Sequence, residues 1–145
     1  MKVIALKGLG NTGKTTTIKL LCDLYLNSPS SVFSSCSFTR LPGDSKSDYK
    51  RIYSLSTATK TYKVGVCSEG DTAKSLKDTF NSFKNCDIAI VACRTKGGSF
   101  EIVKTSSSDV IWAGKSQDRT SSANRIDQLN KIDAKKLLNI LSLCL

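Results

Sequence analysis

Short continuous apolar runs alternate with amphipathic stretches along the chain, and this alternation predicts strands and helices in turn. A continuous apolar run is typical of a strand that is covered on both faces of a parallel sheet. Apolar residues spaced three and four positions apart predict helices that bury one face. The predicted strands are 1–7, 32–38, 49–56, 61–68, 87–93 and 109–114. The predicted helices are 16–26, 72–85, a short one ending at Ser106, and 125–145.

This order of elements predicts an α/β fold built as a three-layer sandwich. We expect a mostly parallel sheet of about five strands, with helices on both faces. The gap at 57–60 is short enough for an antiparallel hairpin, which we place at the edge of the sheet. With 145 residues, the chain is expected to form a single domain over 1–145.

The most specific motif is the run Gly8-Leu9-Gly10-Asn11-Thr12-Gly13-Lys14-Thr15, which fits G-x-x-x-x-G-K-[ST] at every fixed position. It lies between the first predicted strand and the first predicted helix. Glycines allow successive N–H groups to point at one anion, at the positive end of a helix dipole. Lys14 would contact the β- and γ-phosphates, and the Thr15 hydroxyl would ligate Mg²⁺. The other predicted binding residues are Gly8, Gly10, Asn11, Thr12, Gly13 and Thr16.

On this motif and its flanks, residues 1–26 resemble the P-loop NTPase superfamily. The resemblance implies a parallel sheet between helices, Mg-nucleotide binding and phosphoryl-transfer chemistry, without choosing among kinases, GTPases and ATPases. The guanine-reading pattern [NT]-K-x-D has no match, because lysine and aspartate in 114–118 are one residue too far apart. Leu9 stands where partition-type ATPases carry an additional lysine. ATP is therefore the expected nucleotide, with Mg²⁺ as cofactor.

Loops 8–15, 68–72 and 94–99 follow predicted strands, so we expect them to meet around one ligand at the carboxyl edge of the sheet. Asp71 is the first candidate for the Mg²⁺ carboxylate and Glu69 the second. The alternative for Asp71 is a helix cap, a role that Thr72 could also take. The place of Arg94 is similar to that of the arginine-bearing lid of small P-loop kinases, and this resemblance implies contact with the transferring phosphoryl group; the alternative is a solvated basic turn. The predicted catalytic residues are thus Lys14, Glu69, Asp71 and Arg94.

The hypothesis that follows is an ATP-dependent phosphotransferase of the nucleotide-kinase type, acting on a small-molecule phosphoryl acceptor. Two alternatives remain open at this stage. One is an ATPase coupled to a protein or nucleic-acid partner, and the other is a nucleotide-dependent binding module without turnover. The sequence does not name the acceptor.

Composition bears on the catalytic base, on the role of the cysteines, on the partners and on the location of the protein. The chain has no histidine, so any general base must come from another residue type. None of its six cysteines forms a C-x-x-C pair, and Cys22, Cys67 and Cys93 are predicted to be buried apolar groups. The net charge of +10 favours anionic partners, although its dispersed lysines predict only weak nucleic-acid binding. No run reaches the ~20 apolar residues of a membrane span, and a cytoplasmic location without membrane contact is expected.

Overall fold

The structure is a computed structural model that describes residues 1–117 and 122–145. Six strands form one mixed sheet in the order β2-β3-β4-β5-β1-β6. The strands are β1 (Lys2–Lys7), β2 (Ser35–Arg40), β3 (Lys50–Ser56), β4 (Thr61–Cys67), β5 (Ile88–Cys93) and β6 (Val110–Gly114). The helices are α1 (Lys14–Leu21), which continues into a π-helical turn η1 (Cys22–Leu26), α2 (Ala73–Ser82), α3 (Gly98–Ser106) and α4 (Ala123–Cys144).

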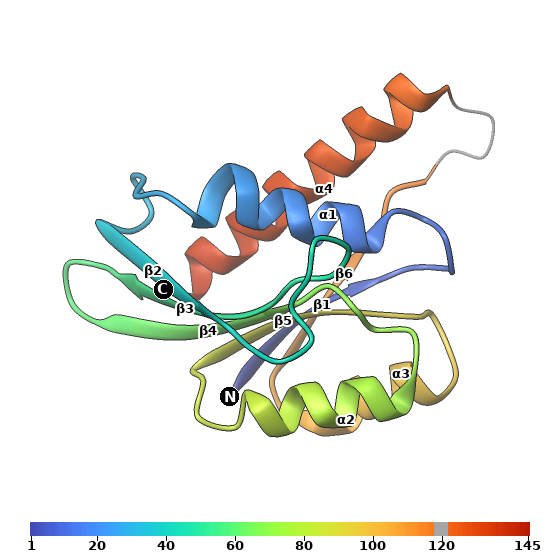
Figure 1. The fold of residues 1–145 in the computed structure, drawn as a ribbon, viewed down its shortest axis with the longest axis horizontal. Coiled ribbons are helices and arrows are strands. Elements are labelled where there is room, and N and C mark those ends of the chain that lie inside the picture. Colours follow the sequence, from blue (N-terminus) through green and yellow to red (C-terminus); the bar gives the residue numbers. More distant parts are fainter. Residues whose placement is uncertain (118–121) are drawn as a thin grey trace.

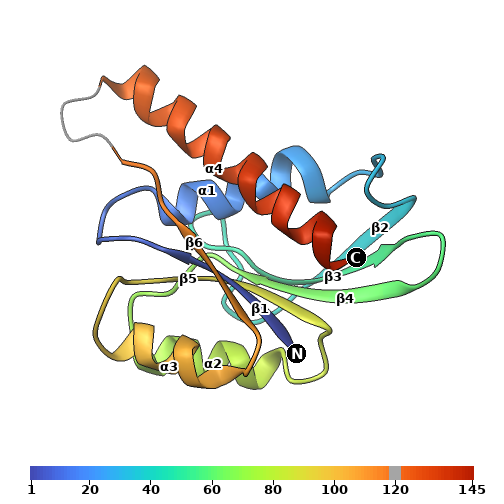
Figure 2. The ribbon, with the colours of Figure 1, turned by 180° about the vertical axis from the view of Figure 1, so that it is seen from behind.

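The helices cover both faces of the sheet, so the predicted layered α/β fold is confirmed. Figures 1 and 2 show α1 and α4 on one face and α2 and α3 on the other. Side chains of β1 alternate between the two layers: Ile4 and Leu6 pack toward α1 and α4, whereas Val3 and Ala5 pack toward α2 and α3. Among the described helices, none combines the length and apolar character that a membrane crossing requires.

The strand pairing differs from expectation at one edge. β1 pairs in parallel with β5 and β6, and β4 pairs in parallel with β5, which confirms a mostly parallel sheet. β3 runs antiparallel to both β2 and β4. The predicted hairpin of β3 and β4 therefore lies inside the sheet, and β2 forms the edge. The polarity of the side chains explains this order of strands. Ser35, Ser37 and Thr39 of β2 are exposed, as suits an edge strand, whereas the end of β4 is fully buried.

The cysteines behave as predicted. Cys22, Cys67 and Cys93 are buried and unpaired. Burial raises the pKa of the Cys22 and Cys93 thiols to about 11, so both stay protonated at neutral pH. Their role is packing.

Candidate functional site

The glycine-rich loop 8–15 joins the end of β1 to the start of α1, and its backbone is unusual at two points. Asn11 and Gly13 both adopt positive φ, at 58° and 88°. A side chain at Gly13 would also be blocked, because a Cβ there would lie 2.6 Å from Oδ1 of Asn130. Glycine is therefore required at position 13 by conformation and by space. At the other end of the loop, Gly8 N–H donates to the carbonyl of Cys93 at 3.1 Å, which fixes the loop to β5.

Lys14 folds back over this loop. Its Nζ donates to the carbonyl oxygens of Gly8 at 3.0 Å and Leu9 at 2.7 Å, and its side chain is buried. Burial lowers the pKa of Lys14, the charge of Asp71 opposes that effect, and Arg94 adds to it. An ammonium has three N–H donors. Two of them contact the loop, so the third can serve a ligand.

The N-terminus of α1 completes an anion-binding arrangement. The helical ladder begins where Thr17 N–H donates to the carbonyl of Gly13 at 2.9 Å. The N–H groups of residues 14–16 precede that bond and therefore lie outside the ladder. These groups carry the positive end of the helix dipole toward the loop. Three backbone donors and one ammonium thus surround the same turn.

Asp71 and Thr15 meet Lys14 in one cavity of about 350 Å³, together with Ser68 and Gly70. The Thr15 hydroxyl donates to the carbonyl of Ser68 at 3.4 Å, which connects the loop to the end of β4. Sequence analysis left a capping role open for Asp71 or Thr72. The structure assigns it to Thr72, whose hydroxyl accepts from Ser75 N–H at 3.1 Å. Asp71 is not needed as the cap of α2.

Arg94 brings the third loop to the same place. Its Nε lies 3.6 Å from Oδ1 of Asp71, and a Cβ placed on Gly10 would be 3.4 Å from its Nη1. The guanidinium therefore rests against the glycine-rich loop. Because both members of this ion pair are about half exposed, the pair adds little stability and its partners can separate readily.

Glu69 lies elsewhere, which corrects its expected place beside the metal ligands. It lines a separate cavity of about 110 Å³ with Asp48 and Tyr49. The intervening residue, Ser68, links the two cavities: its hydroxyl donates to Asp48 at 3.0 Å while its carbonyl accepts from Thr15. Glu69 and Asp71 thus line different cavities although they are only two residues apart, and their spacing in the sequence could not predict this difference.

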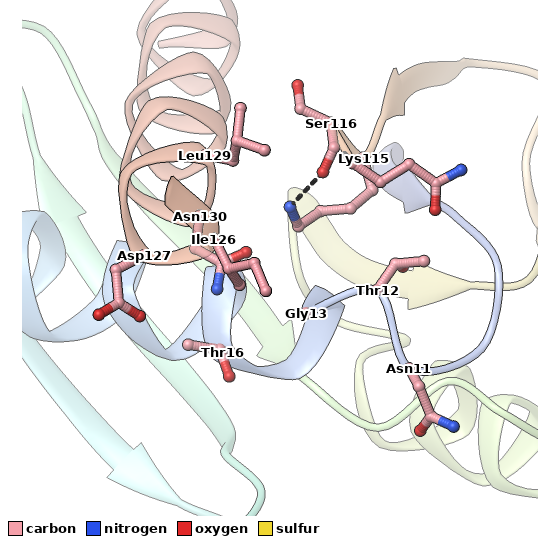
Figure 3. A pocket seen from close by; sticks show the side chains of 11 residues that line it. Asn11, Thr12, Gly13, Thr16, Lys115, Ser116, Ile126, Asp127, Leu129 and Asn130 are labelled. Carbon is pink, nitrogen blue, oxygen red and sulfur yellow. Dashed lines mark hydrogen bonds between the residues drawn. The ribbon is translucent and has the colours of Figure 1, made fainter. Parts of the chain in front are cut away.

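A third cavity, of about 480 Å³ and called the larger cavity below, opens on the other side of the loop (Figure 3). Residues 11–13 line both this cavity and the cavity of about 350 Å³ beside Lys14, and Thr16 belongs to the larger cavity. Its other walls come from residues 115–117 and from the first turns of α4, including Ile126 and Asn130. Sequence analysis identified no site residue on α4.

Comparisons of the chain with models of known protein families, with curated proteins and with solved structures found no match. Among residues 1–117 and 122–145, no group of three or more His, Cys, Asp or Glu side chains is placed to hold a metal ion.

Proposed function

We propose that this protein binds Mg–ATP and transfers the terminal phosphoryl group to a small acceptor, as nucleotide kinases do. The observation that carries the proposal is the convergence of Lys14, the N-terminus of α1, Thr15 and Asp71 on one cavity. Phosphoryl transfer depends on positioning and on neutralising the charge of the phosphates. The cavity supplies fixed positive charge from Lys14 and from helix N–H groups, and Arg94 stands at its rim.

The residues present fit a magnesium ion. Mg²⁺ takes oxygen ligands and keeps several of its waters, so one hydroxyl and one nearby carboxylate suffice alongside phosphate oxygens. The Thr15 hydroxyl would bind it directly and Asp71 through water, since both line the same cavity. The ion would neutralise charge on the β- and γ-phosphates.

The remaining roles fall to the chain's own residues. The remaining N–H of Lys14 donates to a phosphate oxygen, and its charge acts on both the β- and the γ-phosphate. Arg94 exchanges its exposed contact with Asp71 for an oxygen of the transferring group. The oxygen of an acceptor hydroxyl then bonds to the γ-phosphorus as the bond from that phosphorus to the bridging oxygen breaks, so ADP leaves with the electron pair of that bond and the hydroxyl proton is released to solvent. Proton transfer in this step cannot use histidine, because the chain has none.

Replacing Lys14 with methionine tests nucleotide binding. Lys14→Met keeps the buried aliphatic stem and removes the ammonium. Loss of a charge-assisted hydrogen bond of about 1.5–3 kcal/mol should weaken Mg–ATP binding roughly ten- to hundredfold. Isothermal titration calorimetry measures this, with exposed Lys77→Ala as the matched control. Unchanged affinity in folded Lys14→Met would refute the assignment of the loop.

Product analysis tests turnover separately. The wild-type protein is incubated with Mg–ATP and a panel of nucleosides and nucleoside monophosphates, with and without DNA or RNA. ADP that appears only with one small acceptor, together with phosphorylated acceptor, supports the proposal. Phosphate release stimulated by a polymer would instead indicate a coupled ATPase, and binding without either product would indicate a binding module.

A further inference from the structure

Asn130 is a buried polar side chain whose hydrogen bonding is incomplete. It lies on α4, is only 3% exposed, and contacts the glycine-rich loop at Gly13. The Thr17 hydroxyl lies 3.5 Å from its Oδ1. Its Nδ2 has no hydrogen-bond partner among the described residues. A buried donor left unpaired costs about 1–3 kcal/mol, so such a group in a folded protein calls for an explanation.

The unpaired amide faces the larger cavity. Figure 3 shows Asn130 projecting from α4 toward the loop and the first turn of α1, among the other side chains that line this space. Ile126 and Leu129 add apolar surface one turn or less away on the same helix. Ile126 is 44% exposed, so its side chain is accessible to a ligand in this cavity. A concave site that combines apolar walls with a few polar groups is typical of small-ligand binding.

The opposite wall is held firmly in place. Lys115 and Asp133 form an ion pair of 2.9 Å whose side chains are almost fully buried. Asp133 also accepts from the backbone N–H and the hydroxyl of Ser116, at 2.7 and 2.8 Å. These contacts satisfy the buried charges of the wall with protein partners. The amide of Asn130 differs from the exposed polar side chains of the cavity, such as Asn11 and Gln117, because its unpaired donor is buried.

The larger cavity and the cavity beside Lys14 share residues 11–13 of the loop as a wall. A nucleotide whose phosphates lie beside Lys14 would therefore have its nucleoside end next to the loop that also borders the larger cavity. A volume of about 480 Å³ falls within the range of ordinary ligand pockets.

We propose that the larger cavity receives the nucleoside end of the bound nucleotide and that Asn130 recognises it. Nδ2 donates to an acceptor on the base, Oδ1 stays on Thr17, and Ile126 covers the apolar face of the ring. This inference rests on the proposed function, because it presumes a triphosphate beside Lys14. It adds a specificity-determining residue that lies on the last helix, far along the chain from the glycine-rich motif.

The test compares a nucleotide with a ligand that has no nucleoside. Binding of Mg–ATP and of Mg–tripolyphosphate is measured by calorimetry for wild type, Asn130→Ala and Lys14→Met. Asn130→Ala should weaken Mg–ATP binding roughly tenfold and leave tripolyphosphate binding unchanged, whereas Lys14→Met should weaken both. The matched control is Asn139→Ala, which replaces an exposed asparagine on the same helix and should change neither.

A second variant keeps the test valid if Asn130→Ala fails to fold. Ile126→Ala shortens a side chain that is less than half exposed and should lower affinity for Mg–ATP a few-fold, again without affecting tripolyphosphate. Leu143→Ala is its control, since Leu143 is 88% exposed on the same helix.

The outcomes separate the two proposals. If Asn130→Ala weakens both ligands equally, or neither, the assignment of the nucleoside cavity is wrong while the phosphate site stands. The same holds if wild type binds tripolyphosphate as tightly as ATP. If wild type binds neither ligand, the proposed function fails and this inference fails with it.

Discussion

Asp71 is the residue whose role changes most between sequence and structure. From the sequence it could be a metal-binding carboxylate or a helix cap, and the two roles favour the same residue types. The structure gives the cap to Thr72 and leaves Asp71 lining the cavity of Lys14 and Thr15. Its contact with Arg94 is solvent-exposed and contributes little to stability. We propose that Asp71 serves to place negative charge beside Lys14 and Thr15.

Replacing Asp71 with asparagine should therefore affect turnover without affecting the fold. Asp71→Asn keeps the shape and removes the negative charge that Mg²⁺ requires. We expect Mg²⁺-dependent product formation to fall at least tenfold, with the free energy of unfolding within about 0.5 kcal/mol of wild type. Initial rates across a Mg²⁺ titration and urea unfolding measure the two quantities.

Thr72→Ala provides the reciprocal control. Removing the cap should cost about 1 kcal/mol of stability and leave the Mg²⁺ dependence of turnover as it is in wild type. Full activity in Asp71→Asn would instead contradict the metal role, and the carboxylate of the site would have to be sought on another loop.

At the scale of elements, the site depends on how closely the loop after β4 packs against β5. Gly70 lies between Ser68 and Asp71 and is buried. A Cβ there would lie 1.7 Å from the carbonyl oxygen of Ala92, and that atom belongs to the backbone of a central strand. Neither partner can rotate away, so a side chain at position 70 must displace the loop that carries Asp71.

Gly70→Ala should be among the most damaging substitutions in the chain. Overpacking of this kind typically costs about 1–3 kcal/mol, and more where backbone must move. Gly114→Ala is the matched control, because nothing lies within 4 Å of a Cβ at that position. It should change stability by no more than about 0.5 kcal/mol. Urea unfolding of both variants checks the contrast, and equal stabilities would show that the β4 loop is free to shift.

Elements also show how far the sequence could predict this protein. The glycine-rich motif is contiguous, so strand, loop and helix follow from local pattern alone. The position of β2 at the edge of the sheet does not follow from local pattern, because the order of strands depends on how all of them pack together under the helices. Glu69 and Asp71 are two residues apart and line different cavities, with Gly70 packed against the backbone of Ala92 between them, and this tertiary contact is not visible in the local sequence.

The local sequence pattern could not predict the larger cavity either, for a different reason. Its walls come from the loop at 11–13, from residues 115–117 and from α4, which are distant in sequence. One signal was present nevertheless. Asn130 precedes Ala134, Leu137 and Leu141 on the buried stripe of α4, so it is a polar residue at an apolar position. A polar residue on a buried stripe needs a partner, and here that observation indicates a ligand-facing group.

At the scale of the whole molecule, α4 is attached to the sheet edge by buried charge as well as by apolar packing. Asp133 accepts from Lys115 and Ser116, and Lys136 Nζ donates to the carbonyl of Gly114 at 2.7 Å. Burial raises the pKa of Asp133, but the hydrogen bonds from Lys115 and Ser116 and the charge of Lys115 outweigh it, and the net shift is downward. The anion is therefore stabilised in the folded chain.

This downward shift predicts how the whole chain responds to acid. The unfolded state holds the Asp133 proton more tightly, so the stabilisation is complete above the ordinary pKa of 3.8 and is lost as the pH falls through the lower folded value.

Asp133→Asn removes this dependence and leaves Lys115 buried without its counter-charge, at a cost of about 3–5 kcal/mol at neutral pH. We therefore expect Asp133→Asn to be much less stable at pH 7, with a shallower loss of stability below pH 4. Urea unfolding at a series of pH values measures both effects, and Asp127→Asn, an exposed acid of the same helix, is the control. A variant with wild-type stability at pH 7 would mean that apolar packing alone holds α4 on the sheet.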